Sequence, residues 1–143
     1  MKKKILVTGS TGFIGSFLIK ELILRGYKIR INKVKFYSLV NAKKLKSREW
    51  SILLKNIDCI VHCGGKTPRG FFSIKKINFI EENFYPTKLL LEQATLNKVK
   101  HFIFLSSFAV NLVNILKYKN TNYYNYAISK KKIEQLLKKK NNY

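Results

Sequence analysis

A tyrosine and a lysine four residues apart near the carboxyl end of the sequence are the side chains best suited to chemistry. Tyr126 and Lys130 fall in a stretch that predicts an amphipathic helix, and residues at positions i and i+4 share one helix face. A tyrosine hydroxyl is a poor base near neutral pH because its reference pKa is about 10. A neighbouring ammonium favours the phenolate. The pair therefore predicts proton abstraction from a hydroxyl group, with Tyr126 as the base.

A pair of serines closes an apolar stretch that predicts a buried strand. Ser106 and Ser107 follow residues 102–105, and ligands of open α/β sheets bind beyond the carboxyl ends of the strands. There Ser107 would hydrogen-bond the reacting oxygen and fix its position. Each group also has a simpler interpretation: Tyr126 as a surface aromatic, Lys130 as the start of a lysine run, and the serines as a helix cap. Their joint order on the required elements favours catalysis.

A glycine-rich turn near the amino end predicts a phosphate-binding loop. Its glycines are spaced G-x-x-G-x-x-G, after an apolar stretch that predicts a strand and before an amphipathic one that predicts a helix. Glycines there permit a tight turn and a close approach of the backbone to a pyrophosphate. The helix supplies N–H groups and a positive dipole end. The cofactor-binding residues expected in this turn are Gly9, Thr11, Gly12, Phe13, Ile14 and Gly15.

Strands alternate with helices along the sequence, which predicts an α/β fold with a Rossmann-like, doubly wound parallel sheet. Five strands are expected in the order 3-2-1-4-5, without the sixth strand that completes such a sheet. The sheet would then be incomplete at its carboxyl-terminal side, with an exposed apolar edge. The predicted strands are 4–8, 27–32, 36–40, 57–63 and 100–105, and the predicted helices are 13–25, a short one ending at 51–55, 79–96 and 124–139. Residues 66–76 read as a loop and 110–122 as polar and irregular.

These motifs resemble the extended short-chain dehydrogenase/reductase superfamily, in its nucleotide-sugar epimerase/dehydratase branch. The resemblance covers nearly the whole sequence and includes the glycine spacing, the strand segment 60–65 and the Tyr-x-x-x-Lys helix. It implies a NAD or NADP cofactor and a nucleotide-sugar substrate, oxidised transiently at a hydroxyl. By the same resemblance Ser107, Tyr126 and Lys130 are catalytic. Tyr126 and Lys130 also bind the cofactor, with Cys63, Gly64, Gly65 and Asn83 along it.

The sequence departs from the family pattern at two places. Pro86 stands where the family's Asn-x-x-Gly-Thr segment has glycine. The second departure concerns the end of the predicted second strand, where an acidic residue would bind the ribose 2′-hydroxyl of NAD and none is present. Asn32 would hydrogen-bond a ribose hydroxyl instead, while Arg30, Lys33 or Lys35 would accept a 2′-phosphate. The choice between NAD and NADP therefore stays open and leans weakly towards NADP.

The net charge of +22 raises the possibility of nucleic-acid or anionic-membrane binding. The basic residues are nearly all lysines spread along the chain, whereas specific nucleic-acid binding favours clustered arginine with aromatic platforms. A solvated basic surface is favoured. No apolar run reaches about 18 residues, so no membrane span is expected, and we expect a cytoplasmic protein. Cys59 and Cys63 share one strand face, too far apart for a disulfide, and no metal site is expected.

Members of the resembled family continue well beyond the Tyr-x-x-x-Lys helix, so residues 1–143 are expected to form a partial, truncated NAD(P)-binding domain without the substrate-binding lobe. A fragment, the product of a decaying gene and a chain completed by a partner are all open. The functions considered are an epimerase, dehydratase or reductase, an inactive nucleotide-binding remnant or regulator, and a polyanion-binding protein. The resemblance also implies a homodimer packed through helices 79–96 and 124–139.

Overall fold

Four parallel strands form the sheet in the computed structural model, which describes residues 2–31, 45–68, 76–114, 119 and 121–139. The strands lie in the spatial order β2-β1-β3-β4, and each neighbouring pair is parallel. This confirms the Rossmann-like α/β class and the relative order of four of the expected strands. The expected strand at 36–40 lies outside the described residues. The strands are β1 (Lys4–Thr8), β2 (Lys28–Ile31), β3 (Cys59–His62) and β4 (His101–Phe104).

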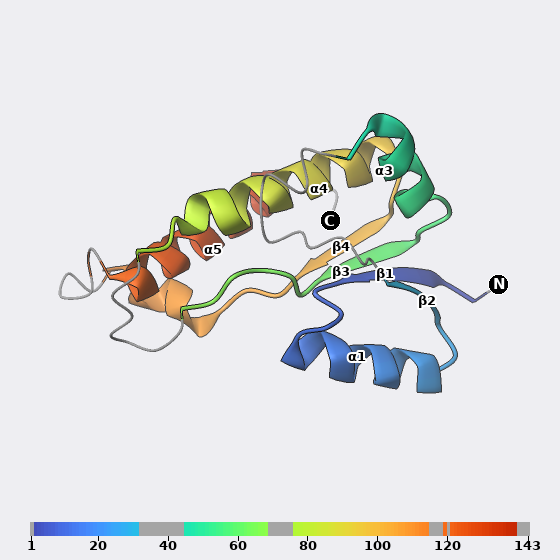
Figure 1. Cartoon of the computed structure of the whole chain (residues 1–143), viewed down its shortest axis with the longest axis horizontal. Coiled ribbons are helices and arrows are strands. Elements are labelled where there is room, and N and C mark those ends of the chain that lie inside the picture. The colour runs from blue at the N-terminus through green and yellow to red at the C-terminus, as the bar shows by residue number, and fades with distance from the viewer. Residues whose placement is uncertain (1, 32–44, 69–75, 115–118, 120, 140–143) are drawn as a thin grey trace.

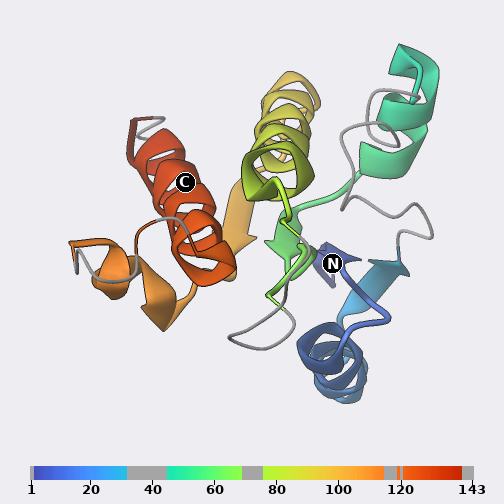
Figure 2. The same ribbon diagram turned by 60° about the vertical axis from the view of Figure 1, so that its left-hand side comes forward.

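Helices cover the two faces of the sheet unequally. On one face lies α1 (Phe13–Leu24), alone among the described helices, and on the other lie α3 (Ser47–Leu54), α4 (Tyr85–Leu96) and α5 (Asn122–Lys139) (Figures 1 and 2). A 3-10 helix, η2 (Phe108–Asn114), links β4 towards α5. The prediction of an irregular stretch beginning at residue 110 is therefore wrong for residues 110–114. Buried Ala109 and Val113 pack against α5 and hold this turn.

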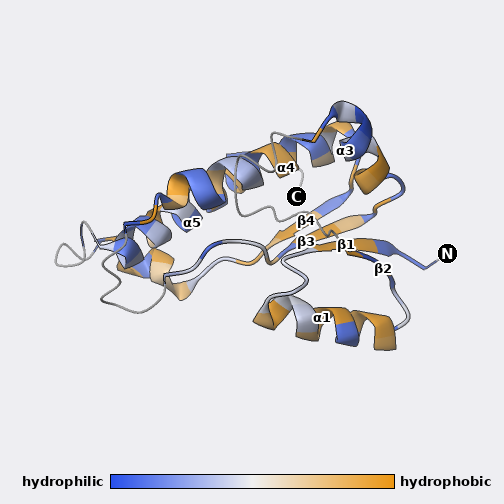
Figure 3. Ribbon diagram, in the orientation of Figure 1, coloured by the Kyte–Doolittle hydropathy of each residue, from blue (hydrophilic) through white to orange (hydrophobic). Residues whose placement is uncertain are grey.

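Side chains alternate between the two faces along each strand, as a pleated backbone requires. On the face covered by three helices, Leu6, Ile60 and Phe102 join a core with residues of α3 and α4. On the other face, Ile5, Val7 and Cys59 pack with Ile19 of α1. Figure 3 shows the apolar colouring of β1 and α1 across this second layer. We call the face covered by α3, α4 and α5 the closed face, and the face covered by α1 the open face.

The helix expected at 79–96 is interrupted near its start. A π-helical turn, η1 (Ile80–Phe84), precedes α4, and the N–H of Tyr85 donates to the carbonyl of Ile80 five residues back. Pro86 follows at the beginning of α4 and has no N–H to continue a regular ladder. The wider turn accommodates that missing donor, and such turns are common at functional sites. In the described part of the chain, no helix is both long and apolar enough to cross a membrane.

Candidate functional site

Two of the three glycines in the first turn are required by the fold itself. Gly9 has φ +68°, and a Cβ on it would lie 2.6 Å from the backbone nitrogen of Gly64. A Cβ on Gly15 would lie 2.2 Å from the carbonyl oxygen of Gly9. Gly12 is less restricted, because its Cβ would meet only that same oxygen, at 3.2 Å. Gly12 is also the N-cap of α1 and is exposed. Internal packing therefore restricts Gly12 less than it restricts Gly9 and Gly15.

The N-terminus of α1 follows this turn directly. The N–H of Gly12 donates to the carbonyl of Gly9 (3.0 Å), which fixes the approach of the chain to the helix. Thr11, Phe13 and Ile14 are exposed around the helix start. The structure thus brings together all six residues expected in the phosphate-binding loop, at the positive end of a helix dipole.

A second glycine turn follows β3 and touches the first one. Thr8 Oγ1 accepts a hydrogen bond from the N–H of Gly64 (3.4 Å). A Cβ on Gly65 would lie 3.4 Å from Asn83 Oδ1 and 3.8 Å from Lys130 Nζ. The absence of a side chain at Gly65 therefore leaves a space bounded by an amide and an ammonium, between the glycine loop and α5.

Ser107, Tyr126 and Lys130 come together at the carboxyl ends of β3 and β4. Tyr126 and Lys130 lie on α5 and are only 8% and 6% exposed. Lys130 Nζ donates to the carbonyl oxygen of Leu105 (2.8 Å) and lies 5.8 Å from the centre of the Tyr126 ring. The Ser107 side chain is hydrogen-bonded to that of Tyr126. The predicted trio is therefore assembled on one side of the sheet, although its members come from two separate segments.

The two serines have different partners. The Ser106 hydroxyl donates to a carboxylate oxygen of Glu134, one turn beyond Lys130 on α5. Ser107 Oγ faces Tyr126 and also accepts a hydrogen bond from the N–H of Ala109 (3.2 Å). Ser106 therefore ties the end of β4 to α5 and leaves Ser107 at the tyrosine.

Burial governs the pKa of both groups on α5. Burial raises the pKa of the Tyr126 hydroxyl, while its hydrogen bond with Ser107 acts in the opposite direction. The expected lowering by Lys130 does not prevail, because the ammonium is turned towards the Leu105 carbonyl. Burial also lowers the pKa of Lys130 to about 8, with the nearby Cys63 thiol partly opposing that shift. The protein groups alone therefore do not favour the phenolate.

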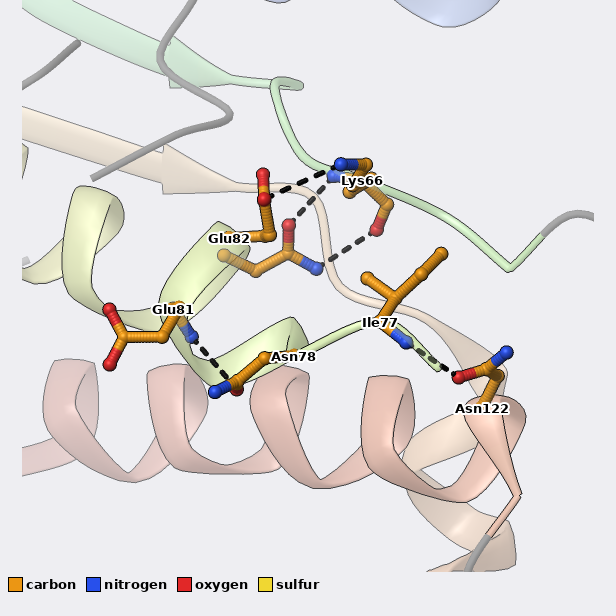
Figure 4. Close-up of polar contacts among 7 residues, drawn as sticks. Lys66, Ile77, Asn78, Glu81, Glu82 and Asn122 are labelled. Carbon is orange, nitrogen blue, oxygen red and sulfur yellow. Dashed lines mark hydrogen bonds and ion pairs between the residues drawn. The ribbon is translucent and has the colours of Figure 1, made fainter. Parts of the chain in front are cut away.

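Asn83 lies in the π-helical turn and is 3% exposed. Its Oδ1 accepts from the N–H of Lys66 (2.7 Å), and its Nδ2 donates to the Lys66 carbonyl (2.9 Å). Figure 4 shows Lys66 lying against this turn and paired with Glu82. Its ammonium is 3.4 Å from a carboxylate oxygen of Glu82. In this position Asn83 fixes the backbone after the second glycine turn.

The comparisons with known proteins agree with this geometry. The model of the "NAD dependent epimerase/dehydratase family" matches residues 5–142. The chain belongs to that family. It is 34% identical over 122 residues to UDP-glucose 4-epimerase of Vibrio cholerae, covering 78% of this chain and 37% of that protein. It is 32% identical over 120 residues to UDP-N-acetyl-alpha-D-glucosaminuronate decarboxylase of Bacillus cytotoxicus, covering 75% and 37%.

Solved structures share the fold of this chain. UDP-glucose 4-epimerase from Bifidobacterium longum, in complex with NAD+ and UDP, superposes with a TM-score of 0.68 at 26% identity, covering 96% of this chain and 48% of that one. A GDP-mannoheptose C4 reductase from Campylobacter jejuni with NADP bound has a TM-score of 0.71 at 17% identity, covering 92% and 41%, and shows the shared fold. The chain thus spans less than half the length of these relatives.

Of the residues expected to discriminate between NAD and NADP, only Arg30 is among the described residues. Asn32, Lys33 and Lys35 lie outside the described residues. The Arg30 guanidinium donates to the carbonyls of Ile52 (2.7 Å) and Leu53 (2.8 Å) at the end of α3. The two solved structures that share the fold hold NAD+ in one case and NADP in the other. Since Arg30 is engaged by α3, it is a poor candidate for a 2′-phosphate.

One buried residue of this region is not among the residues expected from the sequence. His62 ends β3, is 1% exposed and bonds two threonines, Thr8 and Thr87, from two different elements. A histidine in an apolar strand gives no signal of such a role by itself. The signal available was the presence of a threonine before the glycine turn and another in the helix after Asn83.

Proposed function

We propose that residues 1–143 form a partial NAD(P)-binding domain of a nucleotide-sugar epimerase or dehydratase, with Tyr126 as its base. The observation that carries the proposal is the convergence of Ser107, Tyr126 and Lys130 beside two touching glycine turns. Membership of the family and the activities named for its relatives support the substrate class.

The residues present fit a dinucleotide. A cradle that Cβ atoms would fill lies over Gly12 and Gly65, and the positive end of α1 points into the first turn. Gly9, Gly12 and Gly15 would hold the pyrophosphate, with Thr11, Phe13 and Ile14 around it. Cys63, Gly64 and Gly65 would form the wall along the dinucleotide, and Lys130 would hold the nicotinamide ribose.

The chemistry requires a base, a hydrogen-bonding partner and a cation close together. When bound, the oxidised dinucleotide supplies a hydride acceptor and a positive charge. Tyr126 removes the proton of a sugar hydroxyl, and Ser107 hydrogen-bonds the same oxygen and holds it in line. Lys130 keeps a positive charge near the phenol ring. Since burial alone raises the pKa of Tyr126, the added positive charge is what brings the phenolate into reach.

Dinucleotide binding is the first test. At physiological ionic strength, where phosphate attraction to the basic surface is screened, we expect saturable fluorescence titrations with NADH or NADPH. Gly12→Val should weaken binding at least tenfold, because its side chain fills the space left for the pyrophosphate. Ile23→Val, an exposed position on the same helix, is the control and should bind as the unsubstituted chain does. A folded sample without saturable binding contradicts the proposal.

Turnover separates an enzyme from a binding remnant. The chain spans 37% of the Vibrio cholerae relative, which favours testing the second possibility directly. If the chain is an enzyme, we expect product from UDP-glucose and NAD with the unsubstituted chain and none with Tyr126→Phe. The dinucleotide affinity of Tyr126→Phe should stay within about twofold of that of the unsubstituted chain. Dinucleotide binding without any product would identify a non-catalytic nucleotide-binding chain. Full activity in Tyr126→Phe would show that another group is the base.

A further inference from the structure

His62 is the buried titratable group that the proposed proton transfer does not use. It lies on the closed face of β3, with its ring centre 5.9 Å from that of Phe104 in a stacked arrangement. Its Nδ1 is within hydrogen-bond distance of Thr8 Oγ1, and its Nε2 lies 2.8 Å from Thr87 Oγ1. Both ring nitrogens are therefore engaged inside the protein.

The direction of these hydrogen bonds follows from the partners of Thr87. The Thr87 hydroxyl donates to the carbonyl oxygen of Asn83 (2.7 Å), so it has to accept from His62. Nε2 therefore carries the proton, and Nδ1 accepts from the hydroxyl of Thr8. The Thr8 oxygen keeps lone pairs for the N–H of Gly64.

The charged form of the ring does not fit this arrangement. A protonated ring would donate from Nδ1 as well and leave the Thr8 hydroxyl without its acceptor. Burial and the nearby Lys130 charge lower the pKa of His62 to about 3. The ring is thus held neutral in one tautomer at physiological pH.

The chain of hydrogen bonds joins the two ends of the loop at residues 64–66. At one end, Thr8 holds the N–H of Gly64, whose backbone touches Gly9. At the other end, Asn83 holds the N–H and carbonyl of Lys66. His62 connects Thr8 with Thr87, and Thr87 bonds the backbone of Asn83.

We propose that His62, as the neutral Nε2–H tautomer, is a positioning residue that sets the spacing between the two glycine turns and thereby the affinity for the dinucleotide. The inference rests on the proposed function, because it assumes that the dinucleotide lies along those turns. His62 itself touches neither the dinucleotide nor the substrate in this account. It acts through Thr8 and Thr87 on the backbone that does.

The test measures the affinity for NADH of variants that lack one of the hydrogen bonds made by His62. Thr87→Val removes the acceptor of His62 and should raise the Kd for NADH about tenfold, the effect of one lost buried hydrogen bond on a site it shapes. Thr95→Val is the matched control. Thr95 lies on the same helix and its hydroxyl also donates to a carbonyl four residues back, that of Leu91 (3.0 Å), but it lies away from the turns. We expect its Kd to be unchanged.

Two substitutions at His62 separate positioning from stability. His62→Asn keeps an acceptor at the δ position towards Thr8, and His62→Gln keeps a donor at the ε position towards Thr87. Each substitution breaks one of the two hydrogen bonds made by His62, so we expect both variants to bind NADH about tenfold more weakly than the unsubstituted chain, as Thr87→Val does, whatever their thermal stability. A merely structural role would weaken both in proportion to their loss of thermal stability.

The tautomer is read independently by ¹⁵N NMR of the histidine ring. We expect the Nε2–H pattern without titration between pH 5 and 8. An Nδ1–H pattern would overturn the proposal, as would folded Thr87→Val and His62→Gln chains that bind NADH as tightly as the controls. If the unsubstituted chain itself fails to bind NADH, the proposed function fails with it. If the unsubstituted chain binds NADH and substitutions at Thr87 and His62 leave its Kd unchanged, only the positioning role of His62 is contradicted.

Discussion

The two faces of the sheet are built from the same strands but are covered by helices to different degrees. On the closed face, three helices bury Leu6, Ile60 and Phe102 together with Leu90 and Leu91 of α4. On the open face, α1 leaves a groove of about 700 Å³ over β3 and β4. Its apolar lining comes from the helix and the strands: Ile5, Ile14, Leu18, Leu22, Val61, Ile103 and Leu105.

All three predicted catalytic side chains and His62 belong to the closed side. A site that depends on hydrogen bonds of defined direction needs a rigid surrounding, and close-packed helices provide it. The open side contributes the glycine turn and the start of α1, whose outward positions Phe13, Phe17 and Leu24 are at least 62% exposed. Large apolar side chains exposed on one helix commonly mark a contact surface. The contrast therefore teaches that α1 has a surface suited to further packing, whereas the strands of the closed face are covered by three of the described helices.

The largest expected difference is in packing energy. Leu90→Ala on the closed face removes a fully buried side chain and should lower the free energy of unfolding by about 3 kcal/mol. Leu22→Ala on the open face removes a half-buried one that lines the groove, and should cost about 1 kcal/mol. Urea unfolding of both variants measures the difference. Equal losses would mean that the open face is as well packed as the closed one.

The next effect is a pH dependence that belongs to the closed face. Burial lowers the pKa of Lys130 to about 8 in the folded chain, from 10.5. Between these values the unfolded chain binds more protons, so the contribution of Lys130 to stability improves as the pH rises. Between pH 7.5 and 9.5 this gain should be about 2 kcal/mol. The raised pKa of Tyr126 has the opposite sign but acts only above pH 10.

Two variants separate the effect of Lys130 on stability from the general effect of a lower net positive charge at high pH. Lys130→Met should lose the pH-dependent gain, whereas Lys132→Met, at an exposed position on the same helix, should keep it. Chemical unfolding at the two pH values gives both numbers. A gain that survives in Lys130→Met would show that the ammonium is not the buried group responsible.

The closed face also shows what sequence could predict. The order of the strands and the meeting of Ser107 with Tyr126 and Lys130 followed from residue types at element ends, because parallel strands place their carboxyl ends at one edge. The π-helical turn before Pro86 did not follow, since it depends on how a missing N–H is absorbed by the preceding turn. The direction of the Lys130 ammonium depends on the Leu105 carbonyl, which lies 25 positions away in the chain.

The hydrogen-bond chain through His62 was also beyond sequence reasoning. Its members come from β1, β3 and α4, and only the tertiary fold brings them within bonding distance. Arg30 illustrates the same limit. Its place at the end of β2 suggested a phosphate ligand, but the neighbouring α3 offers unpaired carbonyls at its end, and the guanidinium bonds those.

A smaller effect is expected at Arg30, which joins β2 to α3 on the closed face. Arg30→Met should cost about 1 kcal/mol, because the carbonyls it serves are partly open to water. The ratio of NADPH to NADH affinity should not change, since the guanidinium is committed to α3. Arg48→Met, exposed on that helix, is the control for lost charge. Selective weakening of NADPH in Arg30→Met would show that this side chain leaves α3 to bind a phosphate.

The smallest effect on stability is expected at the edge of the open face. Among the described residues β4 pairs only with β3, and Ile103 on β4 is 54% exposed beside the groove. Ile103→Lys should change the free energy of unfolding by less than about 0.5 kcal/mol. It should nevertheless reduce concentration-dependent association, because a charge on an apolar edge strand opposes edge-to-edge pairing. Light scattering across a concentration series measures this.

The control for that edge is Ile52→Lys, which places the same charge at a similarly exposed apolar position, 62% exposed, on α3. It adds one positive charge to the same total and so carries the same general repulsion. If the two variants reduce association equally, net charge is responsible and the edge has no special part. If only Ile103→Lys does so, association runs through β4 and the groove beside it, and the difference between the two faces extends from packing to the contacts the chain makes.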